Sequence, residues 1–248
     1  MNNILETMLA SGRVEDCDGG QIELHSNIGR PGGQLIQECI RLTGARHAVE
    51  VGLAFGVSTL FMLEALAKSD GRLFGIDPDQ HNTMWRGLGL RNIERSGLAG
   101  YYEFFEKPSY QALPELLDRG ERIQFAFIDG WHTFDYVLVD FFYIDKMLDI
   151  GGIVVFDDVG YKSIRKVCHF VLANLGYEVC SKLDGISTKS PLDSAKTSAK
   201  RVFEKLARTD WTPPSAVRSL HEVLDRTTFL AIRKTTEDAR RWDHFVPF

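Results

Sequence analysis

The sequence has few cysteines, no long apolar run and no excess of positive charge. Its four cysteines, at positions 17, 39, 168 and 180, include no close pair, which argues against a zinc site or a disulfide framework. No apolar stretch reaches the ~18–20 residues that a membrane span needs, and the polar first residues predict no signal peptide. With 29 Lys and Arg against 34 Asp and Glu, overall charge does not favour binding to nucleic acid or an anionic membrane. We therefore expect a cytoplasmic protein with no nucleic-acid or membrane partner.

Short apolar runs alternate along the chain with segments of helical periodicity. The expected strands are residues 49–51, 72–77, 101–106, 123–129, 153–156, 176–179 and 227–233. Strands separated by helical segments indicate βαβ units and a mostly parallel sheet, and near-continuous apolar runs are typical of strands buried on both faces. For 248 residues we expect one α/β domain whose seven-stranded, mostly parallel sheet carries helices on both faces.

A glycine turn follows the first expected strand, and the rest of the chain is organised around it. The strand residues Val49-Glu50-Val51 run into Gly52 and Gly56, and Ser58-Thr59 then opens an amphipathic stretch. Glycine allows a sharp turn and a close approach of ligand to backbone. Ser and Thr are good helix-starting residues, and a helix N-terminus attracts carboxylates and phosphates. The turn therefore predicts a site for a small anionic group.

Acidic side chains end four of the expected strands. They are Glu50, Asp77, Asp129 and the pair Asp157-Asp158. In open α/β sheets, ligands bind at the carboxyl ends of the strands, where the strand order reverses. A single acid in such a place is often only a capping or turn residue. Four in succession indicate that these acids share one crevice.

The residues around the turn limit which class of ligand this crevice can bind. Asp77 follows the second strand, where an acid accepts hydrogen bonds from ribose hydroxyls in dinucleotide-binding folds. The glycine spacing is Gly52-x-x-x-Gly56, however, and Val57 stands where the dinucleotide pattern needs a small residue. Glu50 beside the turn repels phosphate and suits a cationic amine or sulfonium. We expect a ligand with a ribose, a carboxylate and a positive charge; an NAD(P)-dependent oxidoreductase is the alternative.

The motif Glu50-x-Gly52-x-Ala54-x-Gly56 with Asp77 resembles the first two motifs of class I S-adenosylmethionine-dependent methyltransferases. Segments 127–132 (Phe-Ile-Asp-Gly-Trp-His) and 156–158 (Phe-Asp-Asp) resemble the branch that includes catechol O-methyltransferase and the metal-dependent sugar O-methyltransferases of antibiotic pathways. The similarity covers about residues 29–180. It implies a Rossmann-like class I methyltransferase that methylates a hydroxyl of a sugar or natural product with help from a divalent metal. A protein that binds S-adenosylmethionine without catalysis is a further alternative.

The resemblance also implies a role for each matching residue. The cofactor would be bound by Glu50, Gly52, Gly56, Ser58, Asp77, Ser109, Tyr110, Asp129 and Trp131. In that set Ser58 would bond the carboxylate of the cofactor, Asp77 its ribose hydroxyls, and Trp131 would pack against adenine. The metal ligands would be Asp129, Asp157 and Asp158, and His132 stands where the catechol enzymes place a lysine general base.

Three positions depart from the resembled pattern. Ala54 replaces a common glycine, His132 replaces the lysine, and Asp158 replaces the asparagine of the catechol enzymes while matching the Asp-Asp of the sugar enzymes. Three of the implied site features also have an interpretation without a functional role. His132 would then be a helix-start residue that bonds to the backbone, Asp157-Asp158 a capping or loop pair without a metal, and Trp131 a core residue.

The implied site is chemically consistent. Three carboxylates without a nearby cysteine suit Mg²⁺, with Mn²⁺ or Ca²⁺ as alternatives. A divalent ion that binds a substrate hydroxyl lowers its pKa, and a histidine with an ordinary pKa of about 6.5 can take that proton near pH 7. In this mechanism Asp129 and His132 are the catalytic residues.

We expect residues 1–248 to form a single domain. Its parts are an N-terminal helical cap or lid (1–46), the cofactor-binding core (47–182), a helical insertion (187–225), and the last strand with an aromatic tail (227–248). The loop Asn27–Gly33 could close over the cofactor, and the basic stretch 187–219 is either a solvated insertion or a recognition element for an acidic acceptor. The tail Trp242–Phe248 is too apolar to leave in water, so we expect it to dock on its own domain or on the partner of a homodimer.

Overall fold

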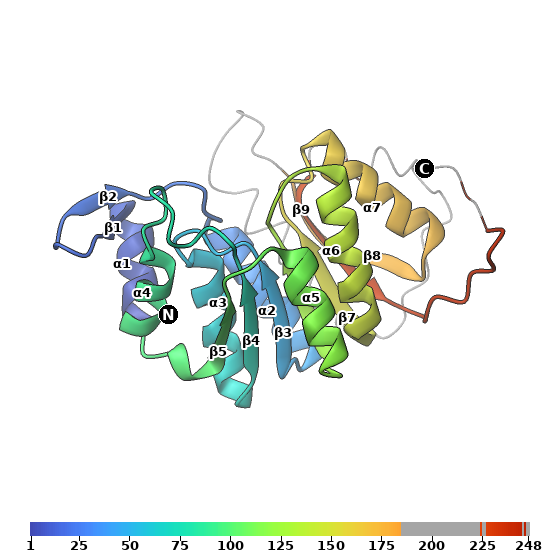
Figure 1. Cartoon of the computed structure of the whole chain (residues 1–248), viewed down its shortest axis with the longest axis horizontal. Helices are drawn as coiled ribbons and strands as arrows, with labels where there is room; N and C mark the ends of the chain where they lie inside the picture. The colour runs from blue at the N-terminus through green and yellow to red at the C-terminus, as the bar shows by residue number, and fades with distance from the viewer. Residues whose placement is uncertain (185–223, 225–226, 245, 247–248) are drawn as a thin grey trace.

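A seven-stranded sheet forms the centre of the computed structural model, which describes residues 1–184, 224, 227–244 and 246 (Figure 1). Across the sheet the strands are β5 (Tyr102–Phe105), β4 (Arg72–Ile76), β3 (His47–Val51), β6 (Ile123–Ile128), β7 (Leu148–Phe156), β9 (Thr227–Lys234) and β8 (Tyr177–Asp184). The strands from β5 to β7 pair in parallel, and β9 runs antiparallel to both of its neighbours. The predicted seven-stranded, mostly parallel sheet is confirmed.

Helices cover both faces of this sheet (Figure 1). One face carries α2 (Arg30–Thr43), α3 (Val57–Leu66) and α4 (Leu88–Arg95), and the other carries α5 (Ser109–Asp118), α6 (Phe134–Met147) and α7 (Lys162–Asn174). Phe125 and Phe127 of β6 pack in the core of the first face, whereas Ala126 and Ile128 pack in the core of the second. Because successive side chains of a strand point to opposite faces, a strand buried on both sides is apolar throughout.

The helix that follows the glycine turn, α3, has no polar face. All residues from Val57 to Leu63 are buried, and they include the expected helix-starting pair Ser58 and Thr59. A helix that is apolar all round must be covered on all sides. Helix α2, which also contacts β6 and β7, and the N-terminal helix α1 (Asn3–Ser11) both pack against α3. The amphipathic character expected for this segment is therefore wrong.

The N-terminal segment, expected only as part of a helical cap over residues 1–46, contains a short helix whose bounds were not predicted and a hairpin that was not expected. Helix α1 begins after Asn2, whose side chain accepts a hydrogen bond from the Ile4 amide at 3.0 Å. Leu5 and Met8 are three residues apart and anchor the helix in the core. The hairpin consists of β1 (Arg13–Glu15) and β2 (Gln21–Glu23). A cap of α1 and this hairpin precedes the core; its function as a lid stays a prediction.

The helix expected over residues 81–98 is wrong at its start, because α4 begins only at Leu88. The Asn82 side chain accepts hydrogen bonds from the amides of Met84 and Trp85, at 2.8 and 2.9 Å. Such side-chain bonds give the backbone an alternative to the helix. The resulting turn ends at Gly87, whose φ is +73°, and it contributes to the site described below.

The expected helical insertion over 187–225 lies outside the described residues, apart from the buried Leu224. The aromatic tail is described only in part. The backbone of Val246 exchanges two hydrogen bonds with the side chain of Asn174, at 3.1 and 3.2 Å, as expected for docking. Trp242, in contrast, is 93% exposed and does not dock on this domain. Among the described helices, none has the length and apolar character needed to cross a bilayer.

Candidate functional site

The register of the sheet brings four strand ends together at one edge. Val51, the last residue of β3, lies opposite Ile76 on one side and Ile128 on the other. Ile128 in turn lies opposite Phe156, the last residue of β7. The residues that follow these strand ends are Gly52, Asp77, Asp129 and Asp157. They meet where the strand order reverses between β3 and β6, which is where open α/β sheets bind ligands.

A cavity of about 980 Å³ opens at this edge. The predicted site residues that line it are Gly52, Ser58, Asp77, Ser109, Tyr110, Asp129, Trp131, His132, Asp157 and Asp158. The start of the expected lid loop also contributes, through residues 26–29. Glu50 and Gly56 are not among the residues that line the cavity.

Glu50 lies inside the sheet rather than at its end. It is fully buried and pairs across the ladder with Gly75 and Phe127. Its two carboxyl oxygens accept hydrogen bonds from the hydroxyls of Ser58, at 2.5 Å, and Thr59, at 2.7 Å. Burial raises the pKa of Glu50 to about 8, against the effect of the two hydroxyls. In this structure the Ser58 hydroxyl and Glu50 therefore bind each other, and Glu50 ties α3 to β3.

The glycine turn contains backbone conformations with positive φ, which residues other than glycine rarely adopt. Gly52 has a φ of +96°, and a Cβ atom there would lie 2.1 Å from the carbonyl oxygen of Asp129. Gly56, with a φ of +81°, is the residue before the first residue of α3. Ala54 has a φ of +47° although it is not glycine, a conformation that costs about 1–3 kcal/mol unless the surroundings hold it.

Asp77 is held by the turn that it faces. Its Oδ2 atom accepts hydrogen bonds from the amides of Leu53, at 3.0 Å, and Ala54, at 3.4 Å. Its Oδ1 atom accepts one from the amide of Asp79 at 2.8 Å. Asp77 is 7% exposed and lines the cavity. The carboxylate is thus fixed in place before any ligand arrives.

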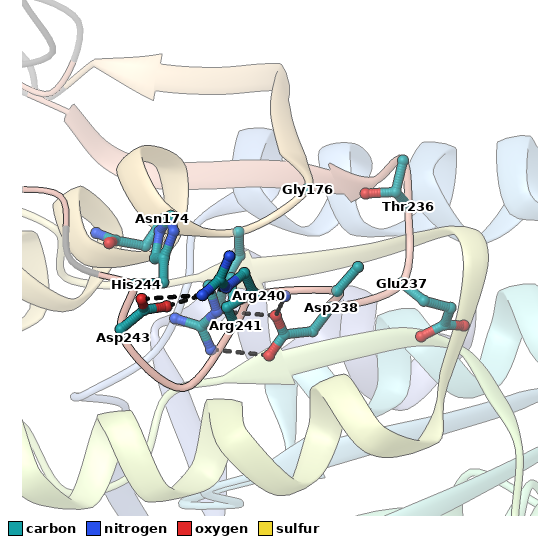
Figure 2. Close-up of a pocket in the computed structure, with 11 residues that line it drawn as sticks. Asn174, Gly176, Thr236, Glu237, Asp238, Arg240, Arg241, Asp243 and His244 are labelled. Atoms are coloured by element: carbon teal, nitrogen blue, oxygen red, sulfur yellow. Dashed lines mark hydrogen bonds and ion pairs between the residues drawn. The ribbon is translucent and has the colours of Figure 1, made fainter.

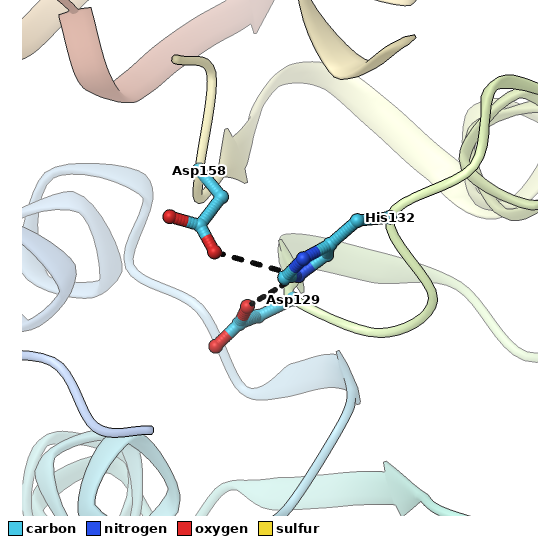
Figure 3. Close-up of side chains that lie close together, drawn as sticks. All are labelled: Asp129, His132 and Asp158. Atoms are coloured by element: carbon cyan, nitrogen blue, oxygen red, sulfur yellow. Dashed lines mark hydrogen bonds and ion pairs between the residues drawn. The ribbon is translucent and has the colours of Figure 1, made fainter. Parts of the chain in front are cut away.

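On the other side of the cavity, two acids and a histidine come together (Figure 3). The Nε2 atom of His132 lies 3.4 Å from Oδ1 of Asp129 and 3.5 Å from Oδ2 of Asp158. Asp158 has a φ of +52°, a strained conformation that is enriched at functional sites. One ligand atom from each of the three residues falls within 4.8 Å of the others, as a metal site requires. The predicted ligand set contained Asp157 in place of His132; Asp157 lines the cavity but lies outside this group.

We call Asp129, His132, Asp157 and Asp158 the acidic cluster. The pKa values of its members depend on one another. Burial raises the pKa of Asp129, and the hydrogen bond with His132 opposes that rise. Burial and the nearby charge of Asp129 raise the pKa of Asp157 to about 8. The hydrogen bond to Asp129 raises the pKa of His132. Raised pKa values in neighbouring carboxyl groups indicate that too little positive charge lies nearby to stabilise their ionised forms.

A divalent cation would supply that charge. Among the described residues that line the cavity there is no lysine or arginine. Carboxylate oxygens are the ligands that Mg²⁺, Mn²⁺ and Ca²⁺ prefer, and an imidazole moves the preference toward transition metals. The donor set of Asp129, Asp158 and His132 therefore fits a divalent cation, and the neighbouring Asp157 adds negative charge.

Aromatic side chains form a rim next to the acidic cluster. Tyr110 and Trp131 are 45% and 63% exposed. Both rings contact Tyr136 of α6, with centroids 6.0 and 6.4 Å apart. Ser109, the first residue of α5, lies 8% exposed beside them. Exposed rings that converge on a cavity offer flat surfaces on which a planar ring can stack.

Several lining residues were missed by the sequence analysis. They are Leu53, Phe55, Asn82, Met84, Trp85, Tyr136, Tyr161 and Phe229. The turn around Asn82 was hidden by the expectation of a continuous helix, although Gly87 and Gly89 gave a signal for a break. Phe229 comes from β9, and its place beside β6 depends on a strand order that the sequence pattern did not reveal.

A second cavity, of about 550 Å³, lies between the end of α7 and the segment after β9 (Figure 2). Its charged side chains pair with their near neighbours: Arg240 with Asp238 at 2.8 Å, and Arg241 with Asp243 at 3.3 Å. These pairs satisfy one another on an exposed surface. This cavity contains none of the predicted site residues.

Comparison with known proteins places this site in context. Residues 49–159 match a family described as "Methyltransferase domain". A caffeoyl-CoA O-methyltransferase of Petunia hybrida is 28% identical over 136 residues, and one of Nicotiana tabacum is 29% identical over 136 residues. These matches cover 51% of this chain and 51% and 52% of the two relatives. The chain thus spans about half the length of the curated relatives it matches.

Solved structures extend the likeness to most of the chain. An O-methyltransferase of Bacillus cereus in complex with SAH has a TM-score of 0.59 and 19% identity, covering 77% of this chain and 87% of the other. The O-methyltransferase TomG of Streptomyces achromogenes, in complex with SAM, has a TM-score of 0.56 and 20% identity, covering 95% and 91%. These likenesses concern the fold, and they confirm the expected Rossmann-like architecture.

Proposed function

We propose that this chain, whose residues 49–159 match a methyltransferase domain, transfers a methyl group from S-adenosylmethionine to a hydroxyl of a small molecule. The observation that carries the proposal is a single cavity that joins the glycine turn and Asp77 to the acidic cluster. Its volume of about 980 Å³ lies at the upper end of the ~300–1,000 Å³ typical of small-molecule sites. This space suits a cofactor and an acceptor bound together.

The two sides of the cavity have separate tasks in this proposal. Gly52 lets the backbone approach the methionine end of the cofactor, Asp77 accepts hydrogen bonds from the ribose hydroxyls, and the rim of Tyr110, Trp131 and Tyr136 packs against adenine. The acceptor hydroxyl lies next to Asp129 and His132. Its oxygen attacks the methyl carbon, the carbon–sulfur bond breaks, and the bonding electron pair stays on sulfur. The hydroxyl proton passes to Nε2 of His132, where Asp129 and Asp158 stabilise the imidazolium.

The acidic cluster would hold a divalent cation through Asp129, Asp157 and Asp158, next to His132, which stays free to act as the base. A bound cation supplies a lower pKa for the acceptor hydroxyl. Mg²⁺ is the first candidate, and Mn²⁺ or Ca²⁺ are alternatives. The raised pKa of Asp157 is consistent with this part of the proposal, because a nearby positive charge would favour the ionised form of that carboxyl.

Titration calorimetry and a transfer assay test the proposal. We expect S-adenosylmethionine and S-adenosylhomocysteine to bind and NAD(P) not to bind; the reverse would indicate an oxidoreductase. With S-adenosylmethionine and a panel of sugar, phenol and aliphatic hydroxyl compounds, at least one should be methylated. Binding without transfer to any acceptor would indicate a non-catalytic binding protein. Full activity after treatment with EDTA would remove the cation from the mechanism.

A further inference from the structure

One buried amide connects the parts of the cofactor side of the cavity. Gln80 is fully buried, three residues beyond Asp77, and is not among the residues that line the cavity. Its Nε2 atom donates hydrogen bonds to the Ala54 carbonyl at 3.0 Å and to Oδ2 of Asp77 at 3.3 Å. Its Oε1 atom accepts a hydrogen bond from the Gly89 amide at 3.1 Å. The side chain therefore joins the glycine turn, the acid after β4 and the start of α4.

The chemistry of these partners requires an amide at position 80. Two of them, the Ala54 carbonyl and the Asp77 carboxylate, are acceptors, and the third, the Gly89 amide, is a donor. Only an amide offers an N–H₂ group and an oxygen on one terminal carbon, and its orientation here follows from the partners. A glutamate in the same place would set its oxygens against two other acceptors.

The space around the amide is equally restricted. A Cβ atom at Gly89 would lie 2.4 Å from the Ala54 carbonyl oxygen and 2.7 Å from Oε1 of Gln80. The Gly87 amide also donates to the backbone carbonyl of Gln80, at 2.7 Å, which closes the loop between them. Ala54, held by the amide, has the strained φ of +47°. A fixed hydrogen bond to its carbonyl is the kind of support that such a conformation needs.

A second buried amide holds the next carbonyl of the same turn. Asn92 of α4 is 1% exposed, and its Nδ2 atom donates to the Phe55 carbonyl at 3.0 Å. Gln80 and Asn92 thus bind two successive carbonyl groups of the turn, those of Ala54 and Phe55. The backbone amides of Leu53 and Ala54, in the same turn, donate hydrogen bonds to Oδ2 of Asp77. Turn and carboxylate are therefore held as one unit.

From this arrangement we propose that Gln80 is a positioning residue for cofactor binding. It fixes the rotamer of Asp77 and the conformation of Ala54, so that Oδ1 of Asp77 is presented to the ribose hydroxyls. Among the described residues, Oδ1 accepts a hydrogen bond only from the Asp79 amide, and a carboxylate oxygen can accept more than one. The inference rests on the proposed S-adenosylmethionine-dependent function.

The variant Gln80→Met tests the inference because it keeps the size of the side chain and removes all three hydrogen bonds. The chain offers a matched control in Gln37, whose Nε2 atom also donates to a backbone carbonyl, of Phe61 at 3.1 Å, and to a carboxylate, of Glu64 at 3.0 Å. Gln37 joins α2 to α3 away from the cavity. Calorimetry with S-adenosylhomocysteine should show a Kd raised about 10-fold or more in Gln80→Met, as for loss of a hydrogen bond to a charged group. Gln37→Met should bind as the wild type does.

Two further measurements separate positioning from general damage. The penalty of Gln80→Met should shrink to less than about 3-fold in the Asp77→Asn background, because effects on one shared group are not additive. It should shrink in the same way for the 2′-deoxyribose analogue of S-adenosylhomocysteine. If Gln80→Met fails to fold, Gln80→Asn keeps a buried amide that is one methylene too short to reach both Ala54 and Asp77, and it should show the same pattern.

The outcomes are distinct. A wild-type protein that does not bind S-adenosylhomocysteine overturns the proposed function. A wild-type protein that binds it, with an unchanged Kd in both Gln80 variants, overturns the role of Gln80 alone. A raised Kd that stays equal for the ribose and 2′-deoxyribose ligands, or that adds fully to Asp77→Asn, shows a general structural effect and also overturns it.

Discussion

The two sides of the cavity differ in how completely they are built. On the cofactor side, Asp77 accepts hydrogen bonds from the glycine turn, and the side chains of Gln80 and Asn92 donate hydrogen bonds to carbonyl groups of the same turn. On the acidic side, Asp129 and Asp157 have raised pKa values because burial, and then the charges of neighbouring carboxylates, disfavour their charged forms. The first side is preorganised for a ligand, whereas the second needs a positive charge from outside. Preorganisation lowers the cost of binding, and uncompensated charge favours a cation.

The largest effect should come from removing a charge on the acidic side. Asp129→Asn keeps the shape of the side chain, and we expect kcat to fall about 10³-fold, since metal-assisted charge stabilisation is worth several kcal/mol. The affinity for S-adenosylhomocysteine should change much less. Asp118→Asn, an exposed substitution at the far end of α5, is the control. An Asp129→Asn protein with normal kcat would show that the acidic side takes no part in the chemistry.

Removing His132 tests what the imidazole does. As a general base it contributes about 10²–10⁴-fold to the rate, so His132→Ala should lower kcat by that factor and leave the Kd for Mn²⁺ within about 3-fold. If the Kd for Mn²⁺ rises 10-fold or more, His132 is instead a ligand, as its place between Asp129 and Asp158 permits. Stopped-flow kinetics and calorimetry separate the two results. Unchanged kcat and Kd together would exclude both roles.

Changing the cofactor side should cost stability as well as binding. In Gly52→Ala the new Cβ atom lies 2.1 Å from the Asp129 carbonyl oxygen, at a φ of +96°. We expect the free energy of unfolding to fall by about 2–5 kcal/mol from strain and overpacking together. Urea unfolding measures this, and Gly12→Ala, at a positive φ with open space around it, is the control for strain alone. Equal losses in both variants would show that the close approach at Gly52 is unimportant.

A divalent cation should stabilise only through the acidic side. At 100 times its Kd, a bound cation adds about 2.7 kcal/mol to the free energy of unfolding. Mn²⁺ or Mg²⁺ should therefore raise the Tm of the wild type and not that of Asp158→Asn. S-adenosylhomocysteine should raise the Tm of both proteins. A cation-induced rise that survives in Asp158→Asn would place the cation elsewhere.

The last prediction concerns Glu50, behind the glycine turn, and its effect on stability is spread over several pH units. Its folded-state pKa of about 8 exceeds the ordinary value of 4.5, so between these pH values the folded protein binds a proton that the unfolded chain has released. The stability supplied by this group is complete below pH 4.5 and is lost as the pH rises toward 8, by at most about 1.4 kcal/mol per pH unit. Glu50→Gln should remove this dependence in urea unfolding between pH 5 and 8. Exposed Glu23→Gln should leave it unchanged, and a wild-type slope in Glu50→Gln would contradict the assignment.

Most of the fold was predictable because the sheet is buried on both faces. Strands such as β6 are apolar at every position except one, Gln124, and each is followed by a turn or an acid, so their places were clear from the sequence. The bounds of the N-terminal α1, and the β1–β2 hairpin, were missed, because so short a helix gives little periodicity. The start of α4 was misplaced because the side-chain bonds of Asn82 are local and leave the apolar pattern intact.

The site was predictable only as far as strand ends determine it. Gly52, Asp77, Asp129 and Asp157 follow four strands that are in register, so their convergence follows from the parallel order. Glu50 lies one residue before the strand end, and its side chain points into the core with Ser58 and Thr59. That difference depends on the pleat of β3. The pairing of His132 with Asp158 depends on the conformations of the two loops that follow β6 and β7. The hydrogen bonds of Gln80 could not be predicted from the sequence, because its partners come from three separate segments of the chain.

The position of β9 also bears on how the protein is made. This strand follows β8 in the sequence but lies between β7 and β8 in the sheet. During synthesis the outer edge of β7 therefore has no partner until residues 227–234 have left the ribosome. At about 5–20 residues per second, the 70 residues between Phe156 and Thr227 take about 4–14 s. For that time the nascent chain exposes an apolar strand edge, the kind of surface on which chains aggregate and chaperones act.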